Sequence, residues 1–461
     1  MEQDQGNTPE RDTAFDRDWT KGSIVRNLLS LSWSMIINEF LWSMGFIIDM
    51  IWVGRLGAAP VAAVGVAGIV VMVMMTGIFG LSVGTRAMIS RFVGADNAAE
   101  ANHVAQQAFV LNGFIAVVVA ATGFIFAEPI LGLFGLAPDV VAEGTAYLRI
   151  QFVGSVAMSF WVIAENIMYA LGDGVTPMKI TLAARVSQAI FAPFLVLGLW
   201  IFPQMGVGGA ALSNLIAFSV GMALGLWFLF TGRTRLRFTL RNFNLDPPMI
   251  WRIIKIGIPA SVMGIQRSLG RLALMWLIVP FGTLAVAAHT LLTRIDTMLF
   301  LPSLGLGVAG GVLVGQNLGA KQPEQAAKSG WLAAGLAEIF MVICSVDILL
   351  FPEVVIGIFS TEPDLVEITA DFLRIAVAGY LVLGLTAVLQ QSISGAGDTI
   401  PPMLISLALV WGIQLPLALI VLRITDFGVY GIRWAIVTGM VAGAVAYIVY
   451  FRTGRWKRKK V

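Results

Sequence analysis

The sequence predicts an all-α integral membrane protein with twelve transmembrane helices, arranged as two six-helix bundles related by pseudo-two-fold symmetry, with a central cavity. Three observations predict this fold: the composition, the number of long apolar stretches and an internal repeat. The 461-residue chain is 58% hydrophobic and 12% charged, with a mean hydropathy of +0.85. Soluble domains carry about 25% charged residues. We therefore expect the chain to reside in a lipid bilayer.

The chain contains twelve stretches that approach the length of a membrane helix, which needs about 20 mostly apolar residues. They lie at residues 29–54, 60–87, 104–127, 146–170, 178–202, 207–230, 252–280, 285–313, 328–350, 368–395, 402–422 and 429–451. The division that we expect is an N-terminal segment at 1–28, a first lobe at 29–230, a linker at 231–250, a second lobe at 251–451 and a basic tail at 452–461. Residues 1–28 contain no basic stretch that leads into a short apolar core, so we expect no cleavable signal peptide.

Lysine and arginine in the short loops predict the orientation in the membrane. The basic residues outside the spans include Arg233, Arg235, Arg237, Arg241, Lys321, Lys328, Arg455, Lys457, Arg458, Lys459 and Lys460. With twelve spans these residues all fall on one side, and Arg55 is the main exception. We therefore expect a multi-pass protein of the cell inner membrane with both termini in the cytoplasm. Because the positive charge lies in the loops and the tail on one side, it indicates the orientation in the membrane. We therefore expect no nucleic-acid partner.

The chain repeats itself at a spacing of 225 residues. The segment Tyr147-Leu148-Arg149-Ile150 returns as Phe372-Leu373-Arg374-Ile375. The same spacing relates Gly57, Gly94 and Gly172 to Gly282, Gly319 and Gly397. A duplicated unit with an even number of spans enters the membrane in the same sense twice, which predicts two parallel repeats with a cavity between them. Because one chain then supplies the whole pathway, we expect a monomer.

Several motifs, read together, resemble the multidrug and toxic compound extrusion (MATE) family of the MOP flippase superfamily. They are MGFIID at 44–49, VGRLG at 53–57, GIP at 257–259, VAAH at 286–289, LGLG at 304–307, VGQNLG at 314–319 and GAGDT at 395–399. The resemblance covers nearly all of residues 25–450. It implies a V-shaped pair of bundles that exports small amphipathic or cationic organic compounds in exchange for protons or sodium. The DinF-like members, whose coupling acid lies in the first lobe, look most similar.

Ionisable residues inside membrane spans are candidates for function, because they are costly to bury. Asp49 matches the family's first-helix aspartate, so the resemblance implies that it exchanges a proton; the alternative is a buried acid in a local hydrogen-bond network. Glu39 on the same span is a second candidate. Glu165 and Arg185 lie at matching depth on neighbouring antiparallel helices, at about 1.5 Å per residue from the loop that joins them. We expect them to form a salt bridge, which could also act as a switch.

The chain departs from the family's sodium-binding pattern. Where archaeal-type members carry an asparagine and an aspartate on the fifth helix, this chain has Gln188 and Ala192. A hard cation needs several oxygen ligands. We therefore expect protons as the coupling ion, with sodium as the alternative, and no cofactor or bound metal. Asn214 on the sixth span is a candidate polar neighbour of the site.

The second lobe lacks the acids that another branch of the family carries on its seventh and tenth helices. The corresponding stretches at 264–267 and 385–391 contain glutamines instead, and Gln266 is a candidate cavity residue. Arg267 and Arg271 are four residues apart and share one helical face. We expect them to neutralise Asp296; the alternative is that they present positive charge to an anionic group of the substrate.

Two other functions remain as alternatives. A flippase of lipid-linked oligosaccharides, from the same superfamily, would need a basic cavity for pyrophosphate. An intramembrane enzyme is the weaker alternative, because the chain has only His103 and His289 and no nucleophile or HExxH motif. The sequence also lacks a P-loop, so we expect an ion gradient to supply the energy and the chain to have no enzymatic activity.

Overall fold

The computed structural model describes residues 18–135, 137–232, 234, 238–240 and 243–459. Every regular element within these residues is helical, and twelve helices there are long and apolar enough to cross a membrane, which confirms the predicted fold class. Part of the charge that predicts the orientation, namely Arg233, Arg235, Arg237, Arg241 and Lys460, lies outside the described residues.

The helices follow one another in the predicted order. The first half contains α1 (Ile24–Val53), α2 (Ala58–Gly94), α3 (Ala98–Gly132), α4 (Pro138–Ala170), α5 (Val175–Leu197) and α6 (Gly206–Phe230). The second half contains α7 (Pro247–Ile278), α8 (Thr283–Gly319), α9 (Pro323–Leu350), α11 (Pro363–Gly395) and α14 (Gly428–Thr453). Its remaining span, Ile400–Ile424, consists of α12 (Ile400–Leu407), the π-helical η2 (Ala408–Gln414) and α13 (Leu415–Ile424). Short helices are η1 (Val279–Phe281), α10 (Pro352–Gly357) and η3 (Arg455–Arg458).

Helices α2 and α8 are longer than the sequence predicts. Each has 37 residues, whereas the apolar stretches end at 87 and 313. The additional turns carry polar residues that face neighbouring helices and not lipid: Ser90, Gln316 and Asn317 are all buried. Apolar character therefore underestimates the length of a membrane helix whose end is covered by protein.

The backbone shows the internal repeat directly. Positive φ angles recur at the predicted spacing in Gly57 and Gly282, in Asp96 and Lys321, and in Gly172 and Gly397. The last pair has the same φ of 85° in both halves. The two halves therefore turn at equivalent positions, as a duplication predicts.

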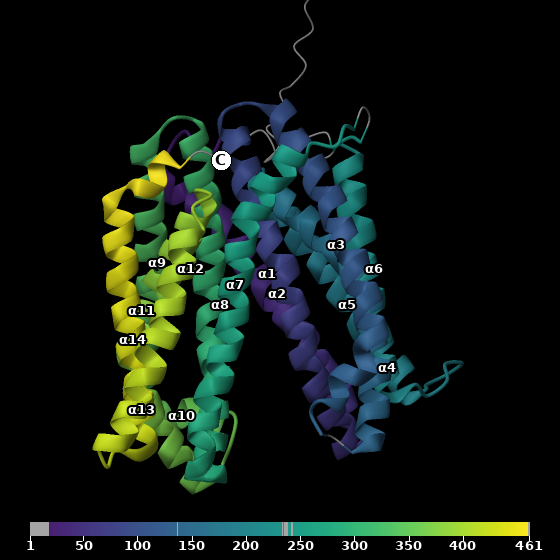
Figure 1. Cartoon of the computed structure of the whole chain (residues 1–461), viewed down its shortest axis with the longest axis vertical. Coiled ribbons are helices and arrows are strands. Elements are labelled where there is room, and N and C mark those ends of the chain that lie inside the picture. The colour runs from purple at the N-terminus through teal and green to yellow at the C-terminus, as the bar shows by residue number, and fades with distance from the viewer. Residues whose placement is uncertain (1–17, 136, 233, 235–237, 241–242, 460–461) are drawn as a thin grey trace, which may run out of the picture.

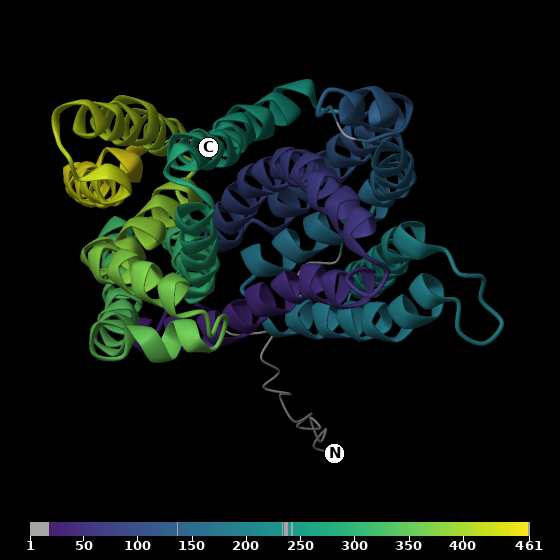
Figure 2. The ribbon, with the colours of Figure 1, turned by 90° about the horizontal axis from the view of Figure 1, so that it is seen from below.

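The helices form two lobes, α1 to α6 and α7 to α14 (Figure 1). The lobes meet at the end of the molecule that carries the C terminus and separate toward the other end (Figure 1). From below, the two bundles occupy opposite sides of the molecule (Figure 2). Contacts of α1 with α8, and of α2 with α7 and α8, join the lobes. This arrangement is the V-shaped pair of bundles that the sequence motifs imply.

Glycines bring the two lobes close together where they meet. A methyl group added to Gly94 of α2 would collide with the backbone of Gln316, and one added to Gly319 of α8 would collide with the backbone of Arg91. Ser90 is fully buried beside these residues. Small residues allow membrane helices to approach at the backbone. We call this contact between the ends of α2 and α8 the seam.

The C-terminal tail covers the same end of the molecule. Trp456 is fully buried and stacks on Phe451, with ring centroids 4.6 Å apart. Lys459 Nζ lies 3.2 Å from the buried carboxylate of Asp398 in the second lobe. The carbonyl oxygen of Lys459 accepts a hydrogen bond from Arg91 Nη1 of the first lobe. The tail therefore connects both lobes beside the seam.

The close backbone contact at the seam can be tested with a cysteine reporter. In a Cys344→Ser background, Ser90→Cys should react slowly with a maleimide because Ser90 is buried in the seam. Adding Gly94→Ala should raise the labelling rate, since the new methyl group must push the backbones apart. Gly335→Ala is the matched control, because no atom lies within 4 Å of its added methyl group. Equal rates in the two alanine variants would contradict a seam held by backbone contact.

Candidate functional site

The first-lobe site is built around Asp49 of α1. Asn214 of α6 donates from Nδ2 to Asp49 Oδ2 at 2.6 Å, and Gln188 of α5 donates from Nε2 to Asp49 Oδ1 at 3.0 Å. Gln188 Nε2 also lies 3.0 Å from Asn214 Oδ1, so the three side chains form one network. Asp49 is only 3% exposed. These three candidates, predicted on three separate spans, therefore lie together in the structure.

Helices α1 and α5 are joined by polar contacts at this level. Gln188 Nε2 donates to the carbonyl oxygen of Gly45, one turn before Asp49, at 3.1 Å. A methyl group added to Gly45 would collide with the guanidinium of Arg185. The glycine therefore leaves space for an arginine next to the carboxylate network, and it brings α5 close enough for Gln188 to reach Asp49.

Arg185 does not form the salt bridge with Glu165 that the sequence predicts. Its Nη1 donates to Gln188 Oε1 at 2.6 Å, and its guanidinium lies over the rings of Trp42 and Trp161, 5.1 and 5.7 Å from their centroids. Matching depth on two helices does not set the direction of a long side chain. Here an amide three residues along the same helix and two indole faces contact the guanidinium in place of Glu165, so that prediction was wrong.

Glu165 of α4 forms a second buried carboxylate site with α1. Asn38 Nδ2 donates to Glu165 Oε1 and Trp42 Nε1 donates to Oε2, both at 3.1 Å. Asn38 Nδ2 also lies 2.6 Å from the hydroxyl oxygen of Tyr169. Because Trp42 contacts both Glu165 and Arg185, one indole connects the two polar groups that were predicted to bind each other.

Two further charged side chains, Glu39 and Arg86, lie within the first lobe. Glu39 is half-buried and forms no hydrogen bond or ion pair with any residue that the structure describes. Arg86 of α2 is buried and donates to Asn166 Oδ1 at 2.9 Å. Arg86 was not a sequence candidate because it lies at the predicted end of its span, where an arginine is expected to be solvated. The observed extension of α2 places it inside the lobe.

In the second lobe, Asp296 of α8 accepts a hydrogen bond from the hydroxyl group of Tyr380 on α11. Arg433 of α14 lies near this pair, and its Nη1 is 3.0 Å from His289 Nδ1. Sequence reasoning missed Tyr380 and Arg433 because their partners are on other helices. His289 belongs to the VAAH motif, which was the one available signal.

Arg267 and Arg271 do not neutralise Asp296 as predicted. Arg267 Nη2 lies 3.5 Å from Gln390 Oε1, and Arg271 Nη2 lies 3.9 Å from the sulfur of Met72 in the first lobe. Neither arginine forms an ion pair within the described part of the chain. The reason is geometric: these side chains extend from α7 toward α11 and the first lobe, whereas Asp296 is bound by Tyr380.

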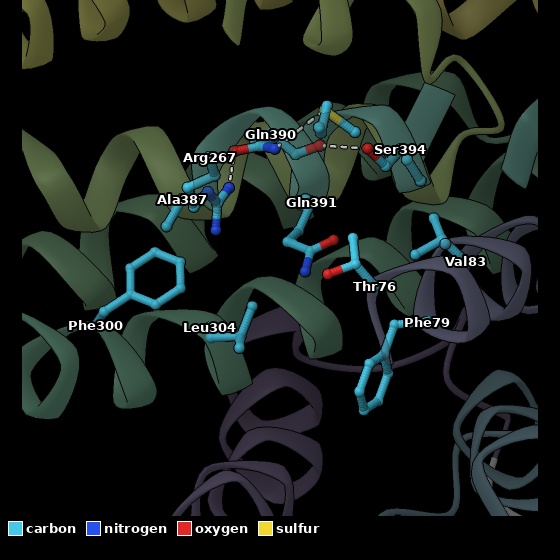
Figure 3. A pocket seen from close by; sticks show the side chains of 14 residues that line it. Thr76, Phe79, Val83, Arg267, Phe300, Leu304, Ala387, Gln390, Gln391 and Ser394 are labelled. Carbon is cyan, nitrogen blue, oxygen red and sulfur yellow. Dashed lines mark hydrogen bonds between the residues drawn. The ribbon is translucent and has the colours of Figure 1, made fainter. Parts of the chain in front are cut away.

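Two cavities meet at Arg267. The larger, of about 410 Å³, lies inside the second lobe, and its lining includes Arg271, Asp296 and Arg433. Gln266 borders the same cavity and donates to the hydroxyl of Ser406. The smaller, of about 230 Å³, is lined by both lobes and contains Thr76, Phe79, Val83, Leu304, Gln391 and Ser394 (Figure 3). The cavities share Arg267, Phe300, Ala387 and Gln390. In the described residues, no group of three or more His, Cys, Asp or Glu side chains could hold a metal ion.

The energetic role of the Asp49 network can be measured with two buried asparagines. Asn214→Ala removes the donor at 2.6 Å from a buried carboxylate, which should destabilise the protein by about 1–3 kcal/mol. Asn112→Ala is the matched control, since Asn112 is equally enclosed but its Nδ2 has no hydrogen-bond partner among the residues that the structure describes. Thermal unfolding in detergent should give the lower midpoint for Asn214→Ala. An equal or larger loss in Asn112→Ala would show that the network does not stabilise the lobe.

Known proteins resemble this chain over most of its length. Residues 34–194 and 259–420 match the MatE family model. The Probable multidrug resistance protein YoeA of Bacillus subtilis is 24% identical, covering 96% of this chain and 96% of that protein. The FAD transporter of Shewanella oneidensis is also 24% identical, covering 92% and 94%.

A solved structure shows the same fold. It is described as the outward-facing conformation of a multidrug resistance MATE family transporter of the MOP superfamily, and it superposes with a TM-score of 0.89 at 23% identity, covering 96% of this chain and 98% of that one. The two-lobed architecture is therefore that of solved MATE structures. Because the family model matches most of the chain, this membrane protein belongs to the MatE family of multidrug and toxic compound extrusion transporters.

Proposed function

We propose that this chain is a secondary active exporter that moves small amphipathic or cationic organic compounds across the cell inner membrane by alternating access, in exchange for protons. The observation that carries the proposal is the environment of Asp49, a buried carboxylate whose contacts at 2.6 and 3.0 Å are to the neutral amides of Asn214 and Gln188. Protonation of such a carboxylate breaks no direct ion pair. Names of its relatives, which refer to multidrug resistance and to FAD transport, support an organic cargo.

The arrangement around Asp49 favours a proton over sodium. A hard cation takes about six oxygen ligands. Here Gln188 Oε1 already accepts from Arg185 Nη1 at 2.6 Å, and Asn214 Oδ1 accepts from Gln188 Nε2 at 3.0 Å, which leaves mainly the oxygens of Asp49. The fixed positive charge of Arg185 next to the network also disfavours a second cation. A proton needs only one carboxylate oxygen, so it suits this site better.

The arrangement of the two lobes supports alternating access. The seam and the tail close one end of the molecule, while the lobes separate toward the other end (Figure 1). The expected orientation, with both termini in the cytoplasm, makes the closed end cytoplasmic and this conformation open to the outside. Separation of the lobes at the seam would then open the opposite side. A monomer supplies both lobes, and the function needs neither enzymatic activity nor a cofactor.

Proton coupling through Asp49 can be tested in proteoliposomes with two amphipathic xanthene dyes, the cation tetramethylrhodamine methyl ester and the anion carboxyfluorescein. Uptake is measured into acid-inside vesicles with the membrane potential clamped at zero, and a sodium gradient is tested separately. Asp49→Asn should reduce proton-driven uptake to the level of protein-free vesicles, because the amide cannot carry the proton. Asp347→Asn, which changes an exposed acid on α9, is the matched control and should retain uptake.

Three outcomes of that assay would contradict the proposal. Full proton-driven uptake by Asp49→Asn would show that Asp49 is not the coupling site. Uptake that follows the sodium gradient alone would show that sodium, and not the proton, is the coupling ion. No uptake of either dye by the wild type under either gradient would favour a flippase of lipid-linked cargo.

A further inference from the structure

We propose that the cavity of the second lobe binds the anionic group of an amphipathic organic anion, and that Arg267 and Arg271 recognise that group. The inference rests on the proposed export function and narrows its cargo from amphipathic or cationic compounds to those with a carboxylate, sulfonate or phosphate group. It depends on which charges lie in the cavity and on which of them lack a partner.

Arg267 and Arg271 face a cavity and have no opposite charge within salt-bridge distance among the described residues. The contact of Arg267 with Gln390 Oε1 is 3.5 Å long, and the contact of Arg271 with the sulfur of Met72 is 3.9 Å long. Both arginines line the larger cavity, and neither has a carboxylate within salt-bridge distance in the described residues. Arginine inside a membrane protein normally pairs or faces a water-filled pathway. These two therefore face the space through which cargo would move.

The cavity as a whole carries excess positive charge. Its charged lining consists of Arg267, Arg271 and Arg433 against a single carboxylate, Asp296. The hydroxyl group of Tyr380 already donates to Asp296, so this acid is partly satisfied by the protein. The first-lobe carboxylates line neither of the two cavities. A cationic cargo would meet repulsion here, whereas an anion would meet unpaired donors.

The shape and the neutral lining suit an aromatic anion. The guanidinium of Arg267 lies 5.5 Å from the ring centroid of Phe300, so the charged group and an aromatic face lie side by side. Guanidinium groups bind carboxylates and phosphates through two parallel hydrogen bonds. Gln390 adds an amide group to this cavity, and Gln391 and Thr76 add an amide and a hydroxyl group to the smaller cavity that adjoins it at Arg267 (Figure 3). The volume of about 410 Å³ lies within the range of small-molecule pockets.

In this arrangement both lobes would contribute contacts to the bound cargo. Arg267 borders the larger cavity inside the second lobe and also the smaller cavity, which Thr76 and Phe79 of α2 line from the first lobe. An anion held by Arg267 would therefore contact residues of both lobes. Movement of one lobe against the other would change those contacts, which gives the cargo a route to bias the lobe equilibrium.

The test is equilibrium binding of the two xanthene dyes to the purified full-length protein, measured by fluorescence anisotropy. The wild type should bind carboxyfluorescein more tightly than tetramethylrhodamine methyl ester. Arg267→Gln should weaken carboxyfluorescein binding by about ten- to hundredfold, since it removes a charge-assisted contact. Arg423→Gln, at the exposed end of α13 and outside both cavities, is the matched control and should bind like the wild type.

A second variant, with the opposite expected effect on anion binding, separates a loss of the site from misfolding. Asp296→Asn removes the single carboxylate of the cavity and keeps an oxygen that can accept from Tyr380, so it should strengthen carboxyfluorescein binding and weaken that of the cationic dye. Misfolding would change the binding of both dyes in the same direction, so opposite changes for the two dyes exclude it. Tighter binding of the cationic dye by the wild type, or unchanged carboxyfluorescein binding in Arg267→Gln, would overturn the inference.

Binding without an ion gradient also separates this inference from the proposed function. If carboxyfluorescein binding depends on Arg267 but no gradient drives uptake, the anion site stands and the exporter proposal fails. If a proton gradient drives uptake of the cationic dye, and anion binding does not depend on Arg267, the exporter stands and the anion site fails.

Discussion

A polar group inside the hydrocarbon region of a membrane must find its partner within the protein, because lipid offers none. This constraint accounts for the all-helical fold, in which each span satisfies its own backbone. It also accounts for where the charged side chains lie. Asp49 is bound by two amides, Glu165 by an amide and an indole, and Arg185 by Gln188 and two indole faces. A cavity lets water or cargo take the place of a protein partner, and Arg267 and Arg271 lie at such a cavity.

The same constraint accounts for a difference in side-chain chemistry between two lobes that share one backbone plan. The repeat preserves the turns, as at Gly172 and Gly397 with equal φ. The side chains inside the lobes have diverged: buried carboxylates with neutral donors gather in the first, and arginines around a cavity gather in the second. A carboxylate of the first kind can take and release a proton, while an unpaired arginine can hold an anion. This difference supports the proposal that the first lobe takes the coupling ion and the second lobe the cargo.

Much of the fold could be predicted from the sequence, because apolar runs, loop charges and the repeat are local or periodic signals. The Asp49 site was partly predictable, since Gln188 and Asn214 are polar residues on spans that the motifs identify. The pairing of Glu165 with Arg185 was not, because side-chain direction depends on Trp42, which belongs to another helix. The bonds of Tyr380 and Arg433 likewise join distant segments, so no short motif reports them.

In the proposed function, a carboxylate of the first lobe exchanges a proton as the second lobe takes up cargo. Proton release on cargo binding tests it most directly. A weakly buffered solution of the purified protein is titrated with carboxyfluorescein and then with tetramethylrhodamine methyl ester, and the pH change is followed at each step. We expect the dye that binds to release protons from the wild type and not from Asp49→Asn. Binding without proton release in the wild type, or equal release in both proteins, would contradict the coupling of Asp49 to cargo.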